Sequence, residues 1–462
     1  MVPAAPGRLV AASWQALRME LPPMFKLAWP VVLSELGWMA MGIVDTMIVG
    51  RLSTVAIGAV SLGEILFNTA VWTGAGLLLG LDTLISQSFG AGDIAGCHRS
   101  LLQGLYLSVP VSIALMSVVW LSAPALSNFG IAPDVLREAL PYLYAVVWSA
   151  FPLLVYFACR RYLQAMNLVK PVMFALISAN VLNLAGDWIL VFGLYGAPAM
   201  GTEGAAWSTC ICRVYMALFL AAYIFYHDSR HATGLTRTPL APDLRRIGRL
   251  IRLGLPAALQ ITFEVGVFAA ATMLIGRLTA EALAAHQIAL NAISVTFMAP
   301  LGIGAAAAVR VGQALGRGDI PAANRSGWTA VLLGVGFMSC AAVVFLAVPE
   351  PLIRAYTSDP NVLRIGVSLL AAAAAFQLFD GIQAVTTGAL RGAGDTRTPM
   401  ICHLTAYWGL GLPLGYYLCF RRNWGALGLW TGLSLAIILI GIGLLWTWSR
   451  AMSRPRAHAT SS

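Results

Sequence analysis

The chain has 462 residues, of which 59% are hydrophobic and only 10% are charged. Soluble domains carry about 25% charged residues, so this composition excludes an ordinary soluble protein. The charged residues cluster between long apolar runs, which indicates that lipid surrounds most of the chain. The net charge of +10 is typical of short basic loops beside membrane spans, so we expect no nucleic-acid partner.

Apolar runs of about 20 residues, long enough to cross a bilayer as α-helices, recur along the chain. Twelve spans are predicted, at residues 27–50, 56–80, 101–123, 139–159, 171–193, 204–227, 251–276, 283–308, 327–349, 366–390, 399–419 and 425–449. The fold class is therefore an all-α membrane protein. Its predicted parts are a cytoplasmic lead (1–26), a six-helix lobe (27–227), a cytoplasmic linker (228–250), a second six-helix lobe (251–449) and a cytoplasmic tail (450–462).

The distribution of basic residues predicts the orientation of the spans. With both termini in the cytoplasm, 21 of the 29 Lys and Arg residues fall inside, 7 fall outside, and Arg213 lies within a span. Because basic residues are retained on the cytoplasmic side, this bias favours a multi-pass protein of the bacterial inner membrane with both termini inside.

The two halves of the chain repeat. Pro30 matches Pro256, and Gly50-Arg51-Leu52 matches Gly276-Arg277-Leu278, both at an offset of 226. The turn Gly90-x-Gly92-Asp93 matches Gly316-x-Gly318-Asp319 at the same offset, and we expect Asp93, Asp319 and the similar Asp395 to cap helices. Six spans per copy give both lobes one orientation, which predicts a pseudo-two-fold axis along the membrane normal and a central cavity.

Four carboxylic acids stand out inside the apolar spans: Asp45, Asp187, Glu264 and Asp380. None has a basic residue within one helical turn, so local ion pairs do not explain them. Ionisable groups at this depth are costly and are functional candidates by default. Because burial disfavours the charged form of a carboxyl group, such an acid can exchange an organic cation for a proton or Na⁺.

Polar side chains accompany these acids at helical spacing, as expected for helix faces that line a wet cavity. The candidate cavity-lining residues are Asn180, Gln260, Gln287, Asn291, Gln377 and Gln383, and Asn183 joins Asp187 on one face. Pro30 is a candidate bending point of the first span, although a static kink explains it equally well.

Several function classes lose support because their motifs are missing. Neither of the two lysines lies in a phosphate-binding loop, and neither the H-E-x-x-H nor the G-x-S-x-G pattern occurs. Seven scattered cysteines form no metal-binding spacing. We therefore expect neither an enzyme nor a bound cofactor.

Together the motifs resemble those of multidrug and toxic compound extrusion transporters, over about residues 25–450. The first span carries P-x14-D-T-x3-G, from Pro30 to Gly50. The second half carries A-H-Q-I-A-L-N at 285–291, V-R-V-G-Q-A-L-G-R-G-D at 309–319 and G-A-L-R-G-A-G-D-T-R-T-P at 388–399. These motifs are similar to those of the bacterial NorM branch.

The resemblance implies that Asp45, Glu264 and Asp380 bind the transported cations, with Na⁺ as one candidate ligand of these acids. It also implies that Asp45, Asn183 and Asp187 match the first-half cluster used by other branches, with Thr209 as a looser match. The expected function is export of organic cations by antiport with H⁺ or Na⁺ through alternating access, performed by a monomer in the bilayer. The alternative is a lipid-linked saccharide flippase of the same superfamily, which would need a basic cavity for its anionic cargo.

Overall fold

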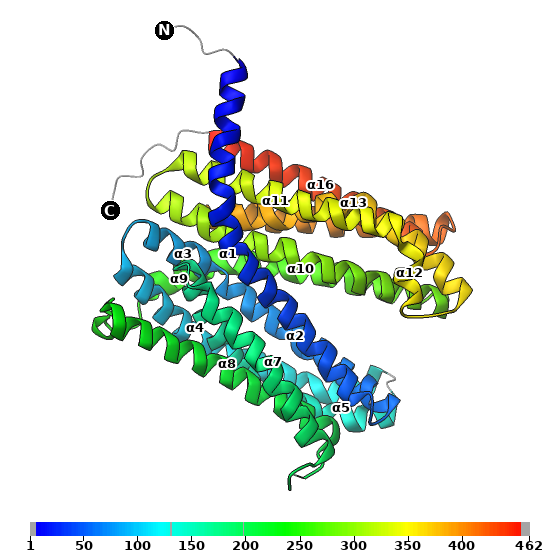
Figure 1. Cartoon of the computed structure of the whole chain (residues 1–462). Helices are drawn as coiled ribbons and strands as arrows, with labels where there is room; N and C mark the ends of the chain where they lie inside the picture. Colours follow the sequence, from blue (N-terminus) through cyan, green and yellow to red (C-terminus); the bar gives the residue numbers. More distant parts are fainter. Residues whose placement is uncertain (1–5, 130–131, 197, 454–462) are drawn as a thin grey trace. The chain divides into compact units, whose positions relative to one another are not determined.

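The computed structural model describes residues 6–129, 132–196 and 198–453, and every regular element in these ranges is a helix (Figure 1). The all-α prediction is therefore confirmed. Residues 1–5 of the predicted lead and 454–462 of the predicted tail lie outside the described residues.

The first half of the chain holds eight α-helices and three short 3₁₀ segments. These are α1 (Pro6–Val49), α2 (Thr54–Leu78), α3 (Gly80–Gly90), α4 (Ile94–Ser122), η1 (Ala123–Phe129), α5 (Pro133–Val146), η2 (Val147–Ser149), α6 (Ala150–Ala165), α7 (Val169–Phe192), α8 (Gly201–His231) and η3 (Leu235–Arg237). The predicted fourth span, 139–159, lies within the continuous stretch formed by α5, η2 and α6.

The second half holds a further eight α-helices and two π-helical segments. These are α9 (Leu244–Ile275), α10 (Ala280–Gly316), α11 (Ile320–Ala347), α12 (Pro349–Arg354), α13 (Pro360–Gly392), α14 (Arg397–His403), η4 (Leu404–Gly411), α15 (Leu412–Tyr416), η5 (Tyr417–Arg421) and α16 (Ala426–Ser453).

Eleven helices in the described ranges are long and apolar enough to cross a membrane. The predicted span 399–419 is also helical from Arg397 to Arg421, but it alternates between α and π geometry. Pro413 lies in this span and has no N–H to donate, which removes one regular helical hydrogen bond. With this segment, which is the eleventh in chain order, the structure has a helix for each of the twelve predicted spans.

The repeated turn after each long helix has the same structure in both halves. Gly92 and Gly318 have φ angles of 77° and 76°, in the left-handed region that favours glycine. The next residue caps the following helix, since Asp93 accepts from Gly96 N and Asp319 accepts from Ala322 N, each at 2.8 Å. The predicted capping role of these aspartates is confirmed.

The chain divides into two compact units. The N-terminal unit comprises Leu33–Leu259, and the C-terminal unit comprises Met1–Val32 and Gln260–Ser462. Both divisions fall inside helices α1 and α9, a few residues after the repeat-matched Pro30 and Pro256. Each unit therefore includes the N-terminal section of the helix that opens the other half.

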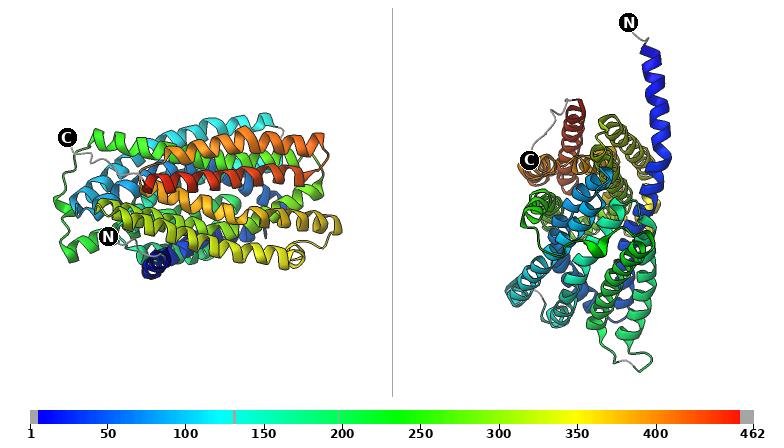
Figure 2. Two further views of the ribbon diagram at one scale, coloured as in Figure 1. Left: turned by 90° about the horizontal axis from the view of Figure 1, so that it is seen from above. Right: turned by 90° about the vertical axis from the view of Figure 1, so that its left-hand side faces the viewer.

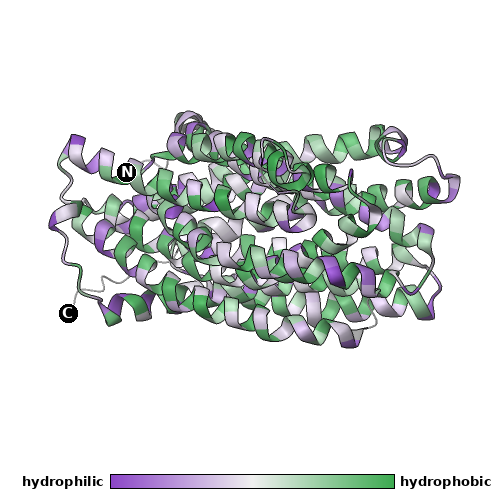
Figure 3. Cartoon of the chain, turned by 90° about the horizontal axis from the view of Figure 1, so that it is seen from below, coloured by the Kyte–Doolittle hydropathy of each residue, from purple (hydrophilic) through white to green (hydrophobic). Residues whose placement is uncertain are grey.

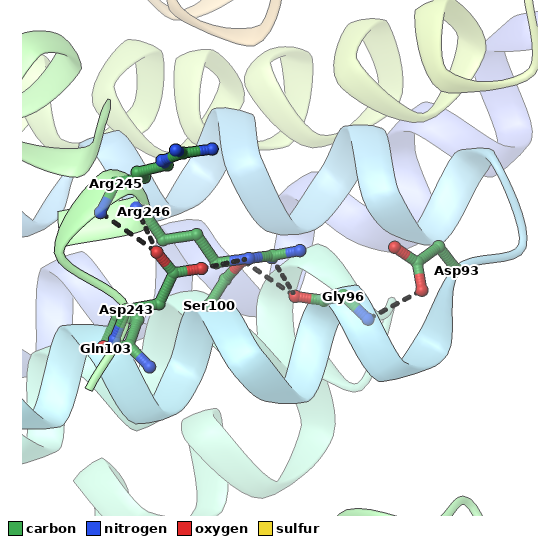
Figure 4. Close-up of polar contacts among 7 residues, drawn as sticks. All are labelled: Asp93, Gly96, Ser100, Gln103, Asp243, Arg245 and Arg246. Atoms are coloured by element: carbon green, nitrogen blue, oxygen red, sulfur yellow. Dashed lines mark hydrogen bonds and ion pairs between the residues drawn. The ribbon is translucent and has the colours of Figure 1, made fainter. Parts of the chain in front are cut away.

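Specific contacts hold the first section of α9 in the N-terminal unit. Arg246 donates to Gly96 O at 3.1 Å and to Ser100 Oγ at 3.2 Å, while Gln103 Oε1 accepts from Asp243 N at 2.9 Å (Figure 4). A Cβ on Gly254 would lie only 1.8 Å from Leu77 O, so this glycine lets α9 approach α2. The linker and the start of α9 are thus bound to α4 and α2.

The first section of α1 is held in the C-terminal unit by a different set of contacts. Arg310 of α10 and Ser326 of α11 both donate to Glu20. A Cβ on Gly302 would lie 2.8 Å from Val32 N, so α10 approaches α1 closely here. A charged residue of the predicted lead is therefore used to fix α1.

Each unit is a bundle of closely packed apolar helices. In the C-terminal unit, α13 packs against α10, α11 and α16, which run side by side in Figures 1 and 2. Hydrophilic residues gather towards helix ends and loops, while the helix bodies are largely hydrophobic (Figure 3). The few polar groups buried within the bundles are therefore the features that need an explanation.

Candidate functional site: two carboxylate clusters

The N-terminal unit buries Asp45 of α1 beside Asp187 of α7. Thr209 Oγ1 of α8 donates to Asp45 Oδ2 at 3.2 Å, and Asn183 Nδ2 donates to Asp187 Oδ1 at 3.5 Å. Four residues that the sequence analysis selected from three separate helices therefore form one cluster.

Three oxygen atoms of this cluster have no donor at hydrogen-bond distance, although the Asp45 and Asp187 carboxyl groups lie close enough to share a hydrogen. They are Asp45 Oδ1, Asn183 Oδ1 and Asp187 Oδ2, and each is fully buried. Buried polar atoms normally have a partner, so an unsatisfied set marks a place for an unseen hydrogen or ion. Carboxylate and amide oxygens are ligands that hard cations prefer. The cluster therefore suits a proton or Na⁺.

Small residues and a second asparagine place the helices around this cluster. A Cβ on Gly186 would lie 2.5 Å from Ser208 Oγ, so α7 and α8 meet closely here. Asn180, a predicted cavity residue, instead donates to Gly37 O at 3.1 Å and fixes α7 to α1. Its amide therefore aligns the two helices that carry the aspartates.

A buried arginine lies one turn beyond the cluster on α8. Arg213 donates to Ser149 Oγ at 2.5 Å, and its guanidinium lies 4.7 Å from the centre of the Phe67 ring. It makes no ion pair with Asp45 or Asp187, although both Asp45 and Glu64 of α2 lie within electrostatic range. The acids of the cluster thus feel a positive charge without being neutralised by direct contact.

The C-terminal unit holds a second cluster, formed by α9, α13 and α14. Gln260 Nε2 donates to Glu264 Oε2, and Gln383 Nε2 donates both to Glu264 Oε1 and to Asp380 Oδ1, each at 3.2 Å. Four predicted site residues therefore meet. Both oxygens of Glu264 receive an amide hydrogen, whereas Asp380 receives one, so Asp380 has more free capacity for a guest.

His403 of α14 completes the second cluster and was not among the predicted site residues. Its Nε2 lies 2.9 Å from Gln383 Oε1 and 3.7 Å from Glu264 Oε2. It was visible in the sequence as a lone histidine in the apolar span 399–419. Its partners lie on α13 and α9, far away along the chain, so only the tertiary structure reveals them.

The remaining predicted cavity residues lie apart from this hydrogen-bond network. Gln377 is buried and donates to Thr296 Oγ1 at 2.7 Å, whereas Gln287 and Asn291 are exposed on α10. Pro30 lies inside the continuous helix α1, two residues before the unit boundary.

The three acids predicted as candidate Na⁺ ligands divide between the units. Asp45 belongs to the N-terminal unit, and Glu264 and Asp380 belong to the C-terminal unit. Within residues 6–129, 132–196 and 198–453, no group of three or more His, Cys, Asp or Glu side chains could hold a metal ion. Any Na⁺ would therefore depend on amide, hydroxyl or water oxygens as well as carboxylates.

Comparison with known proteins identifies the family. The MatE family model matches the chain twice, at residues 30–189 and 256–417. The chain belongs to the MatE family. The two matches start 226 residues apart and end 228 residues apart, as the repeat in the sequence predicts. The MatE chain is therefore built from two copies of one unit.

Curated relatives of this MatE chain are named as multidrug resistance proteins. It is 36% identical to a probable multidrug resistance protein NorM of Mesorhizobium japonicum over 440 residues, 94% of each chain. It is 32% identical to the multidrug resistance protein NorM of Aliivibrio fischeri, over 92% of this chain and 95% of the relative. The predicted NorM resemblance is confirmed.

Solved structures agree on the fold. The eukaryotic MATE transporter AtDTX14 superposes with a TM-score of 0.86 at 21% identity, covering 95% of this chain and 98% of that one. An archaeal transporter of the MOP superfamily from Pyrococcus furiosus gives a TM-score of 0.83 at 18% identity, with 96% and 98% covered. The membrane-spanning transporter fold is therefore shared by this MatE chain.

Proposed function

We propose that this chain exports organic cations from a bacterial cell and takes up H⁺ or Na⁺ in exchange. The relatives named multidrug resistance protein NorM support the efflux role. The inner membrane, with both termini in the cytoplasm, follows from the distribution of basic residues. Cargo and coupling ion are argued from the two carboxylate clusters.

The observation that carries the proposal is that Asp45, Asp187 and Asp380 have no Arg or Lys partner, while two other acids in the helices have one. Glu35 is paired with Arg160, and Glu20 with Arg310. Across the described residues, Asp45, Asp187 and Asp380 form no ion pair with Arg or Lys. An uncompensated acid in an apolar bundle is costly unless a positive guest balances it.

Exchange follows from this need for a guest. The same carboxylates cannot bind an organic cation and a coupling ion at once. Binding of one therefore releases the other. Alternating access of the clusters to the two sides then links the two fluxes. The membrane potential favours inward movement of the coupling cation by about 2.3 kcal/mol per charge per 100 mV.

The first cluster suits the coupling ion in particular. Its three partnerless oxygens come from two carboxylates and one amide, with the Thr209 hydroxyl beside them. A proton needs only one of these oxygens, whereas Na⁺ needs several oxygen ligands. Both ions therefore remain in the proposal.

Everted membrane vesicles test the proposal directly. Ethidium accumulation is measured with a pH gradient alone and with a Na⁺ gradient alone, in wild-type vesicles and in Asp45→Asn vesicles. We expect one gradient to drive accumulation in the wild type and neither to do so in the variant. Glu281→Gln, an acid in the first turn of α10, is the matched control and should transport normally. The antiport proposal fails if neither gradient drives accumulation by the wild type.

A further inference from the structure

Three histidines are buried in the described part of the chain, and both ring nitrogens of each have a partner. They are His98 in the N-terminal unit and His286 and His403 in the C-terminal unit. A neutral imidazole has one donor nitrogen and one acceptor nitrogen, whereas a ring with two N–H groups has two donors. The partners therefore decide which form of the ring fits each position.

His286 fits a neutral ring. Trp430 Nε1 can only donate, and it lies 3.0 Å from His286 Nδ1, so Nδ1 accepts. Nε2 then donates to Thr272 Oγ1 at 2.8 Å, and the Thr272 hydroxyl donates onward to Phe268 O at 2.9 Å. Every donor in this chain of bonds meets an acceptor.

His98 also fits a neutral ring. Its Nε2 donates to the Thr233 carbonyl at 3.1 Å, and its Nδ1 accepts from the Tyr162 hydroxyl at 2.8 Å. These bonds join α4 to α6 and to the linker. His98 and His286 are therefore satisfied structural histidines.

His403 differs because the nearest partner of each of its nitrogens is an acceptor, while the amide nitrogen of Gln260 lies farther from Nε2, at 3.5 Å. Nδ1 lies 2.7 Å from Pro399 O, and Nε2 lies 2.9 Å from Gln383 Oε1. A carbonyl oxygen and an amide oxygen only accept, so these two bonds form together when both nitrogens carry hydrogen, and the Gln260 amide then donates to Glu264 Oε2 rather than to the ring. Glu264 Oε2, 3.7 Å from Nε2, is close enough to balance the resulting positive ring.

The bond from His403 to Gln383 also determines how the Gln383 amide contacts the two acids. Its oxygen faces His403, which leaves its two N–H hydrogens for Glu264 Oε1 and Asp380 Oδ1. The bonds therefore run in one direction, from His403 through the Gln383 amide to both carboxylates. Among the described residues, His403 is the one that bonds to the Gln383 oxygen, and it holds the amide in this direction together with the two carboxylates that accept from the amide nitrogen.

We propose that His403 is a positioning residue that acts on Glu264 and Asp380 through the Gln383 amide, whose direction it sets. The inference deepens the proposed function, because it assumes that these two acids bind transported cations. With His403 in place, both amide hydrogens stabilise ionised carboxylates, the form that attracts a cation.

The reverse direction of the amide needs a different distribution of hydrogens. Turning Gln383 round would place its oxygen against both carboxylates, which repel it unless they carry hydrogen. Its N–H group would then donate to His403, whose ring would keep only the N–H that faces Pro399. The titratable groups that face this network are Glu264 from α9, Asp380 from α13 and Tyr407 from η4, whose ring lies 5.7 Å from that of His403, and the Gln260 amide of α9 lies beside them. The amide direction and the state of the acids are therefore linked.

A double-mutant cycle on the purified full chain tests this role, with the dissociation constant of tetraphenylphosphonium as the readout. We expect His403→Phe to weaken binding about tenfold, the effect of losing one charge-assisted hydrogen bond. In a Gln383→Leu background the same substitution should change binding by less than about twofold, since the amide that transmits the effect is absent. Equal effects in both backgrounds would overturn the proposal.

His286→Phe is the matched control, because it removes a buried histidine of the same unit whose bonds do not reach Gln383. Its effect should be the same with and without Gln383. Unchanged binding in the folded His403→Phe protein would also contradict the inference. Ethidium transport by the wild type is a separate readout, so failure of the proposed antiport is distinguishable from failure of this step.

A spectroscopic measurement on the wild-type protein tests the same proposal without any substitution. In ¹⁵N-histidine-labelled wild-type protein, the ring nitrogens of His98 and His286 should show one N–H each, whereas His403 should show two before a cation is added. A spectrum in which all three buried rings, including His403, carry a single N–H would refute the assigned bond direction.

Discussion

The buried ion pair between Glu35 of α1 and Arg160 of α6 gives a sharp test of how this membrane bundle is stabilised. The two side chains are only 9% and 2% exposed, and Arg160 Nε has no hydrogen-bond partner. Glu35→Gln leaves the guanidinium charged, because arginine does not lose its proton in proteins. The variant therefore buries a positive charge with no direct counter-charge.

Breaking one side of a buried pair costs about 3–5 kcal/mol of the free energy of unfolding. We expect Glu35→Gln to lose this amount in detergent, measured by denaturant unfolding followed through helical circular dichroism. The matched control is Glu350→Gln, whose partner Arg354 lies one helical turn away, with 49% and 65% of the two side chains exposed. An exposed pair contributes about 0.2–1 kcal/mol, so the control should change little.

The double variant Glu35→Leu with Arg160→Met separates charge from packing. Replacing both partners with apolar groups removes the unpaired charge, so it should be more stable than Glu35→Gln alone. The reasoning would be refuted if Glu35→Gln cost less than about 1 kcal/mol, or if the double variant were the less stable of the two.

Three further perturbations follow from the packing and the polar contacts. Asp380→Asn should abolish ethidium export while the protein still reaches the membrane, and export at the wild-type level would remove this acid from the site. Gly388→Ala should destabilise the C-terminal unit by about 1–3 kcal/mol in the same unfolding assay, because its Cβ would lie 2.0 Å from the Gly304 backbone. Gly336→Ala, with open space around it, should not. Arg246→Ala should loosen the linker and speed its cleavage by trypsin, because its bonds to α4 are lost. The Arg245 side chain points away in Figure 4, so Arg245→Ala should change the cleavage only by removing one trypsin site.

Much of the candidate site was predictable from single ionisable residues that lie within apolar membrane spans. Asp45, Asp187, Glu264 and Asp380 are conspicuous because a carboxyl group in an apolar span is costly wherever the helix packs. Asn183 and Gln383 followed from helical spacing, which places residues three or four apart on one face. These signals are local, so one sequence is enough to read them.

The sequence could not distinguish an acid that has a basic partner from one that does not. Glu35 and Arg160 are 125 residues apart, and Glu20 and Arg310 are 290 apart. A lone buried histidine is equally ambiguous: His286 and His403 look alike in the sequence, and only their neighbours show that one is satisfied and the other faces two acceptors.

The sequence by itself determined the membrane class, the spans and the two-fold repeat, because hydropathy and the 226-residue offset are properties of the chain read in order. Tertiary structure decided which polar groups meet and where the compact units divide, inside α1 and α9 rather than in the linker. The physical reason is that hydrogen bonds and ion pairs depend on distance in space, and helix packing brings together residues whose separation along the chain carries no signal.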